Sequence, residues 1–146
     1  MVARVRFYHN AENPLALACE LTARAYASGR RVALRVPDAE TARRLDQLLW
    51  SFDQLAFVPH VMNGTRLAPE TPVLLGLSHE SGNWGHNDLL FNLADDVPAD
   101  FGQFRMLIEV VGQVDSARAP ARSRWTYYKS AGLAIEAFDA VHREAI

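Results

Sequence analysis

Two strand-like segments alternate with two helix-like segments over the first third of the chain, and this order constrains the fold more than any other feature. Residues 2–8 and 31–36 have the apolar pattern of β-strands, whereas residues 14–28 and 38–50 have the apolar stripes of helices. Gly29 ends the first helix as a left-handed residue. Short links between strand, helix and next strand are typical of a parallel sheet. We therefore expect an α/β fold with a mostly parallel sheet flanked by helices.

The remaining two thirds of the chain predict more elements of the same kinds. Residues 72–77, 88–93 and 105–111 are short apolar runs that suit further strands. Residues 100–104 suit a short helical turn before the last of these strands. Residues 61–70 are polar and contain an Asn-Gly pair, so we expect a loop there.

The composition is that of one globular domain. A chain of 146 residues can bury a substantial core, so we expect a single domain, residues 1–146. Its net charge of −2 argues against a general nucleic-acid binder. The single cysteine, Cys19, excludes an internal disulfide, and we expect it to be a small core residue. No segment has the apolar length of a membrane span or the pattern of a signal peptide, so we expect a cytoplasmic protein with no membrane partner.

The segment from Asp115 to Gly132 concentrates positive charge in this slightly acidic chain. It holds four cationic residues against one acidic residue, and we expect a helix with Asp115 or Ser116 as its N-cap. Pro120 is tolerated only in the first turn of such a helix. We expect the helix to run through Gly132, or to restart after it, and to end near His142.

Four side chains share one face of this expected helix. The residues are spaced by four, three and four positions: Arg118, Arg122, Trp125 and Lys129. A row of cations around an indole ring suits an acidic partner that also carries an aromatic or apolar group. A solvated helix face with one half-buried Trp has the same pattern, and the spacing alone leaves both interpretations open.

Residues 49–60 carry a dense group of aromatic and apolar side chains in a segment too irregular for one helix or strand. The group includes Trp50, Phe52, Leu55, Phe57 and Val58. Such a group forms either a buried corner or an exposed apolar patch, and an exposed patch marks a protein interface. Periodicity does not separate the two interpretations.

The glycine-rich loop at residues 78–87 has none of the fingerprints of a nucleotide or metal site. It lacks the Gly-Lys-Ser/Thr of a phosphate loop and the G-x-G-x-x-G spacing. Its His79, His86 and neighbouring acids lack the helix-fixed spacing of metal ligands, so we interpret them as solvated loop residues. The adjacent acids Asp95 and Asp96 are interpreted as turn residues. We therefore expect no catalytic residue, no cofactor and no metal.

A series of short motifs, spread over nearly the whole chain, matches one known family in order and spacing. The motifs are Phe7-Tyr8, Gly29-Arg30-Arg31-Val32, Leu45-Asp46 with Leu48 and Trp50, Phe57-Val58-Pro59-His60, Glu109-Val110-Val111, Arg122-Ser123-Arg124-Trp125 and Tyr128-Lys129-Ser130-Ala131-Gly132. In these motifs the chain resembles the chi subunit of bacterial DNA polymerase III, a clamp-loader accessory protein.

The resemblance implies a Rossmann-like fold without a nucleotide-binding loop and a role in protein recognition rather than catalysis. Chi subunits bind the acidic C-terminal tail of single-stranded-DNA-binding protein, which ends in Pro-Phe, and the psi subunit of the clamp loader. The resemblance therefore implies an accessory subunit of the polymerase III holoenzyme that acts in replication and associates with DNA indirectly, through these two partners.

The resemblance also implies two sets of binding residues. Those implied for the tail peptide lie in and beside the cationic helix: Val114, Arg118, Arg122, Trp125 and Lys129. Those implied for psi lie in the aromatic segment: Trp50, Phe57, Val58, Pro59 and His60. The second set favours the exposed interpretation of that segment.

Two functions of other classes remain as alternatives. One is a nucleotide- or metal-dependent enzyme whose site is the loop at residues 78–87. The other is direct binding of single-stranded nucleic acid by Arg118, Arg122, Arg124 and Trp125, because cations beside an aromatic ring are also that signature.

Overall fold

The strands of the described residues form one eight-stranded sheet. The computed structural model describes residues 4–53, 57–80, 84–99, 101–141 and 144–145. The strands are β1 (Arg4–Ala11), β2 (Val32–Val36), β3 (His60–Met62), β4 (Val73–Leu77), β5 (Leu89–Asn92), β6 (Met106–Gly112), β7 (Ala134–Asp139) and β8 (Glu144–Ala145). They lie in the order β3-β4-β2-β5-β6-β1-β7-β8, and every neighbouring pair is parallel except β7 with β8. The expected α/β fold with an open, Rossmann-like sheet is confirmed.

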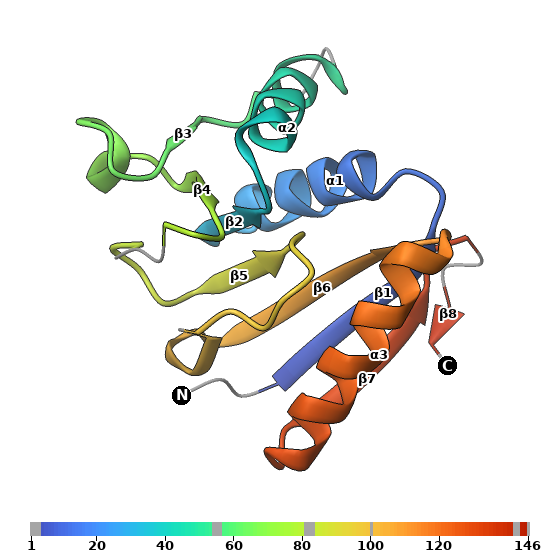
Figure 1. Ribbon diagram of the computed structural model, residues 1–146. Coiled ribbons are helices and arrows are strands. Elements are labelled where there is room, and N and C mark those ends of the chain that lie inside the picture. The colour runs from blue at the N-terminus through green and yellow to red at the C-terminus, as the bar shows by residue number, and fades with distance from the viewer. Residues whose placement is uncertain (1–3, 54–56, 81–83, 100, 142–143, 146) are drawn as a thin grey trace.

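Three helices cover the two faces of this sheet (Figure 1). They are α1 (Pro14–Ala27), α2 (Ala39–Ser51) and α3 (Asp115–Ser130), and two 3-10 turns are η1 (Ala68–Glu70) and η2 (Phe101–Gln103). Leu34 of β2 packs in the core cluster that contains the buried residues of α1 and α2, whereas Ala33 packs in the cluster that contains those of α3. Because successive strand side chains point to opposite faces, α3 covers the face opposite α1 and α2.

The first two helices begin as the sequence predicts. Asn13 caps α1, with its side-chain oxygen accepting from the Ala16 amide at 3.1 Å, and Asp38 caps α2 by accepting from the Thr41 amide at 2.7 Å. That hydrogen bond lowers the pKa of Asp38. Within the described residues, no helix has the length and apolar character needed to cross a membrane.

The prediction for the end of the chain is wrong beyond Ser130. Gly132 adopts φ = 82° and ends α3, and Ala134–Asp139 then form β7 beside β1 instead of a continued helix. The segment contains two alanines and one glutamate, which favour helices locally. Pairing with the otherwise open edge of β1 outweighs that local preference.

Three smaller predictions are also corrected. The N-cap of α3 is Val114 and makes no side-chain capping bond, so Asp115 is the first helical residue. Pro120 is then the sixth residue of the helix and lies in its second turn, where it removes one backbone hydrogen bond. The expected loop at residues 61–70 begins inside β3, an edge strand of three residues that is too short to show a period.

Candidate functional site

A groove of about 550 Å³ runs between α3 and the strands beneath it. Its floor is apolar and comes from β1, β6, β7 and the inner side of α3, whereas its rim carries cations and an indole ring. The lining residues are Phe7, His9, Val111, Arg118, Ala121, Arg122, Trp125, Thr126 and Ala137. The groove therefore offers an apolar bed and a positive rim to the same ligand.

Small side chains create the hollow and large aromatic rings close one end of it. Ala121 on α3 and Ala137 on β7 leave space that larger residues would fill. Phe7 is buried in β1, and its ring centroid lies 5.1 Å from that of Trp125, which is half-buried. Tilted aromatic contacts of this kind stabilise a fixed ring position, so the indole is held in place at the edge of the groove.

The structure brings three of the five residues implied for the tail peptide into this groove. Arg118 and Arg122 are exposed at its rim beside Trp125. Lys129 is exposed one turn further along α3 and does not line the groove. Val114 is 63% exposed at the start of α3 and lines a neighbouring hollow with Gln113 and Ala117.

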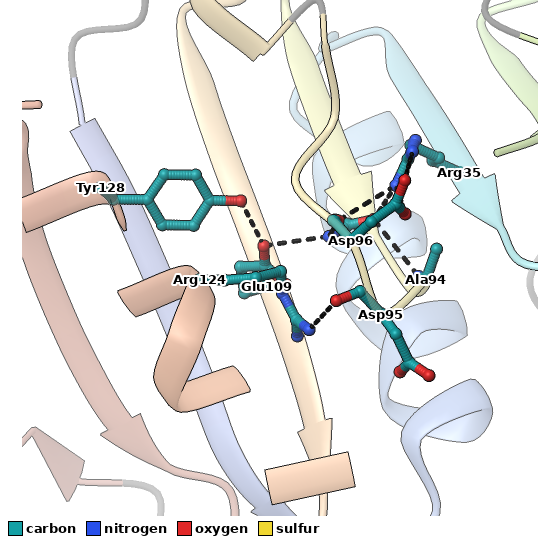
Figure 2. A network of polar contacts seen from close by, with 8 residues as sticks. Arg35, Ala94, Asp95, Asp96, Glu109, Arg124 and Tyr128 are labelled. Atoms are coloured by element: carbon teal, nitrogen blue, oxygen red, sulfur yellow. Dashed lines mark hydrogen bonds and ion pairs between the residues drawn. The ribbon is translucent and has the colours of Figure 1, made fainter. Parts of the chain in front are cut away.

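A buried ion pair fastens α3, the helix that lines the groove, to β6 (Figure 2). Arg124 donates from Nε to Oε1 of Glu109 at 3.1 Å, and both side chains are at most 5% exposed. The hydroxyl of Tyr128 donates to the other carboxylate oxygen at 2.6 Å, and the side-chain amide of Asn92 donates to that oxygen at 3.0 Å. Arg124 is thus unavailable to a ligand, and the prediction of an accessible cation there is wrong.

The same network continues to β2 and to the loop after β5. Arg35 donates to Oδ1 of Asn92 at 2.9 Å and to the carboxylate of Asp96 at 3.0 Å, while Arg124 donates to the carbonyl of Asp95 at 2.8 Å. Asp95 and Asp96 therefore serve different partners and do not form a carboxylate pair. The network ties three strands and α3 together at the carboxyl end of the sheet.

Burial and charge shift the pKa values of the groups in this network. Burial raises the pKa of Glu109, although Arg124 opposes the shift, and burial together with Glu109 raises the pKa of Tyr128. The hydrogen bond from Arg35 lowers the pKa of Asp96. Every polar group of the network is matched by a partner, which fits a structural role.

The aromatic segment at the end of α2 has two exposed rings, followed by residues that are buried. Trp50 and Phe57 are 57% and 64% exposed, with ring centroids 5.7 Å apart. Val58 and His60 are buried, and Pro59 is half-buried. His60 lies against the Trp50 ring at 4.8 Å, and its Nε2 atom is 3.1 Å from a carboxylate oxygen of Asp46. His60 therefore packs against the Trp50 ring, and Val58 and His60 are too buried to be the surface contacts expected for psi. Leu55 lies outside the described residues.

His79 and Glu80 are exposed after β4, as expected of solvated loop residues, whereas His86 and Asp88 are half-buried, contrary to that expectation. Trp84 is buried and covers Gly76 so closely that an added Cβ there would lie 2.5 Å from the ring. His86 is half-buried, and burial lowers its pKa. Asp88 accepts two hydrogen bonds from the Nε and Nη2 atoms of Arg30, at 2.9 and 2.6 Å. In the described part of the chain, no group of three or more His, Cys, Asp or Glu residues is placed to hold a metal ion.

Cys19 lies fully buried in α1, which confirms the prediction of a core residue. Burial raises the pKa of its thiol to about 12. A thiol with that pKa remains protonated near neutral pH and is a poor nucleophile.

Sequence reasoning missed two kinds of functional residue. Phe7 and His9 of β1 could not be assigned to the groove because the pattern of one strand does not show which helix packs over it, and Ala137 could not be assigned because β7 was expected to be helical. The Glu109–Arg124 pair had a signal in the sequence, because Glu109 interrupts an apolar strand and a buried carboxylate requires a partner. Its partner in another element could not be identified from local spacing.

Comparison with known proteins agrees with this architecture. The family model described as "DNA polymerase III chi subunit, HolC" matches residues 2–136. DNA polymerase III subunit chi of Pseudomonas aeruginosa is 34% identical over 122 residues, which cover 84% of this chain and 83% of the relative. The proteins of the same name from Escherichia coli and Haemophilus influenzae are 32% and 29% identical over 118 and 116 residues, about 80% of each chain. The chain therefore belongs to the family of DNA polymerase III chi subunits.

Proposed function

We propose that this chi subunit links the clamp loader to single-stranded-DNA-binding protein by holding the acidic C-terminal tail of that protein in the groove beside α3. It is a non-catalytic accessory subunit of the replication machinery in the cytoplasm, and it reaches DNA through its partners. The observation that carries the proposal is the combination, in one groove, of an apolar floor and two exposed arginines.

The two parts of the groove match the two parts of a tail that ends in Pro-Phe. The apolar floor of Phe7, Val111 and Ala121 suits the terminal phenyl ring, which buries a large apolar area. Arg118 and Arg122 suit the α-carboxylate and the preceding acidic side chains. Exposed ion pairs each contribute only about 0.2–1 kcal/mol, so most of the affinity comes from burying the phenyl ring. We expect a dissociation constant on the order of micromolar.

A second partner, the psi subunit of the clamp loader, is proposed to bind the exposed rings of Trp50 and Phe57. Large aromatic side chains at such exposure are typical hot spots of protein interfaces. The buried His60 packs against the Trp50 ring and holds it in place. The chain thereby carries two protein-binding surfaces, one for the tail and one for the clamp loader.

The direct test is a titration of a fluorescent acidic peptide ending in Pro-Phe into the Arg122→Glu variant. Reversing this charge removes one attraction and adds a repulsion, so we expect binding to weaken by about tenfold or more. The matched control is Arg44→Glu, the same change on the exposed side of α2, across the sheet. The control should bind the peptide as the unmodified protein does.

Two further readings complete the test. Binding of the peptide by the unmodified protein should weaken as salt rises, because exposed charges are screened. Equal affinity of Arg122→Glu and Arg44→Glu, or affinity indifferent to salt, would contradict the proposed site. Tight binding of a single-stranded oligonucleotide in the absence of any peptide would instead favour direct recognition of nucleic acid.

A further inference from the structure

We infer that His9 is a third anion-binding side chain of the groove. It lies across the groove from Arg118, and its protonation makes the affinity for the tail depend on pH. The inference rests on the proposed function, because it assigns a role within the same site. It concerns a residue on β1 rather than on the cationic helix.

The directions of the elements place His9 and Arg118 at the same end of the groove. Helix α3 begins just beyond the carboxyl end of β6 and leads back into β7, which is parallel to β1, so α3 runs antiparallel to these strands. Arg118 therefore lies near the carboxyl ends of the strands, and Trp125 lies about 10 Å further back along the helix. On β1, Phe7 contacts Trp125, and His9 follows two residues later towards the carboxyl end.

The imidazole lies on the groove face, because β1 keeps its register with β7 as far as His9 even though its register with β6 shifts between Tyr8 and Ala11. Val5 and Phe7 belong to the core cluster beneath α3, and His9 is the next residue of that face and lines the groove. The backbone is fixed at this point, because the His9 carbonyl accepts from the Ala140 amide at 2.8 Å. His9 is half-buried, so its position is defined while its ring remains open to a ligand.

Among the described residues, the charged groups around His9 come from two elements, α3 and β7. Helix α3 presents Arg118 and Arg122 at the rim, and β6 contributes only the apolar Val111. Strand β7 places Asp139 in register with His9, and Asp139 accepts from the Val141 amide at 2.9 Å and from the Asn10 side chain at 3.4 Å. A carboxylate of the ligand between His9 and Arg118 would complete an anion site formed by the helix and the sheet together.

This arrangement couples binding to protonation. An anionic ligand stabilises the imidazolium over the neutral imidazole, so the complex takes up a proton and affinity rises as pH falls. Peptide carboxylates and arginines keep their charges between pH 6 and pH 8. A change of affinity over that interval therefore reports on histidine.

The test compares peptide affinity at pH 6 and pH 8 for the unmodified protein and three variants. We expect the unmodified protein to bind about fivefold more tightly at pH 6, the size of one exposed ion pair. His9→Gln should bind with the pH 8 affinity at both values, and His9→Arg, whose charge is permanent, should bind tightly at both. The control is His79→Gln. His79 is exposed and follows β4, which is separated from β1 by three strands of the sheet, so this variant should keep the pH dependence of peptide binding.

Each result decides between the two proposals. If the unmodified protein binds the peptide equally at pH 6 and pH 8, or if His9→Gln keeps the pH dependence, the role of His9 is wrong while the groove stands. If the unmodified protein binds the peptide at neither pH, the proposed function itself fails and this role fails with it. Urea unfolding of His9→Gln should match that of the unmodified protein, which separates a lost contact from a lost fold.

Discussion

Glu109 is a fully buried carboxylate in the middle of an apolar strand, and its three partners explain why it is tolerated there. Arg124 neutralises it, while Tyr128 and Asn92 donate to its second oxygen. Removing one partner of a satisfied buried network leaves a polar atom without compensation, and that loss outweighs the strength of the bond itself. The helix that carries Arg122 and Trp125 is thus fixed to the sheet by polar contacts as well as by packing.

The Tyr128→Phe variant should therefore be less stable than the unmodified protein by about 1–3 kcal/mol, because Glu109 loses a buried donor. Urea unfolding followed by circular dichroism measures the difference. Tyr127→Phe is the matched control on the exposed neighbour and should change stability by less than about 0.5 kcal/mol. Equal unfolding midpoints for the two variants would mean that the hydroxyl of Tyr128 contributes nothing to the network.

A second residue-scale prediction concerns acid stability. The hydrogen bonds from Arg30, and secondarily the Arg31 amide, lower the pKa of Asp88 in the folded protein. A lowered carboxyl pKa stabilises the fold above the unfolded value of about 4, and this contribution is lost as pH falls through the folded value.

Asp88→Asn should consequently be destabilised by about 1–2 kcal/mol at pH 7, and the difference should shrink as pH falls from 5 towards 2. Urea unfolding at several pH values tests this. Glu40→Gln, which breaks an exposed pair with Arg43, should cost less than about 0.5 kcal/mol at pH 7. A constant difference for Asp88→Asn across pH would exclude the charge of Asp88 as the cause.

The sequence predicted which side chains of α3 have the chemistry to bind an acidic ligand, but not which of them are exposed to it. Arg118, Arg122 and Trp125 meet in the groove as the helical spacing predicts. Arg124 is a cation of the same helix, but it is buried because it pairs with Glu109 of β6. Spacing along α3 cannot identify a partner on a strand. Contacts between elements determine which cations are exposed, and the sequence pattern of a single element does not contain those contacts.

At the scale of elements, the end of α3 determines whether β7 can form. Gly132 has φ = 82°, a conformation that disfavours other residues, and it turns the chain so that Ala134–Asp139 lie along β1. An added Cβ at Gly132 would meet no atom within 4 Å, so the constraint at this residue is on the backbone alone.

Gly132→Ala should therefore destabilise the protein by about 1 kcal/mol through backbone strain. The matched control is Gly102→Ala, a glycine with equal free space and no positive φ. That variant should be neutral or slightly more stable, because alanine restricts the unfolded chain. Thermal unfolding of both variants measures the effect, and an equal change in the two would show that the turn at Gly132 is not strained by a side chain.

The elements predicted correctly are those whose pattern is strong within their own length. The helices at Pro14–Ala27 and Ala39–Ser51 and the buried strands β2, β4, β5 and β6 all lie where the apolar patterns predict. Strand β3 has three residues, and β7 mixes Ala and Glu, which favour helices, with Ile135 and Phe138, which favour strands, so both depend on neighbours in the sheet. Because β7 was not predicted, its contribution to the groove, Ala137, was not predicted either.

At the scale of the whole molecule, the two proposed binding surfaces lie at opposite ends of the sheet order. The groove lies over β6, β1 and β7, whereas Trp50 lies near the end of α2, lines a hollow with residues of β3 and packs against Phe57. Figure 1 shows β3 at one end of the sheet and β7 towards the other. Surfaces this far apart on one rigid sheet should bind their partners independently.

Phe57→Ala should therefore reduce psi binding by at least about tenfold, because an exposed aromatic hot spot is lost, and should leave tail-peptide affinity unchanged. Isothermal titration with purified psi and with the peptide measures both. Arg122→Glu should show the reverse pattern. Loss of both activities in Phe57→Ala would contradict independent surfaces and indicate a damaged fold.

The central claim is that the groove beside α3 recognises an acidic tail by its terminal phenylalanine. The most direct measurement is a titration of the protein with a labelled acidic peptide ending in Asp-Ile-Pro-Phe, beside the same peptide lacking the Phe. We predict saturable binding of the first peptide, on the order of micromolar, and at least about tenfold weaker binding of the second, because the buried ring supplies most of the affinity. Equal binding of the two peptides, or no binding of either, would contradict it.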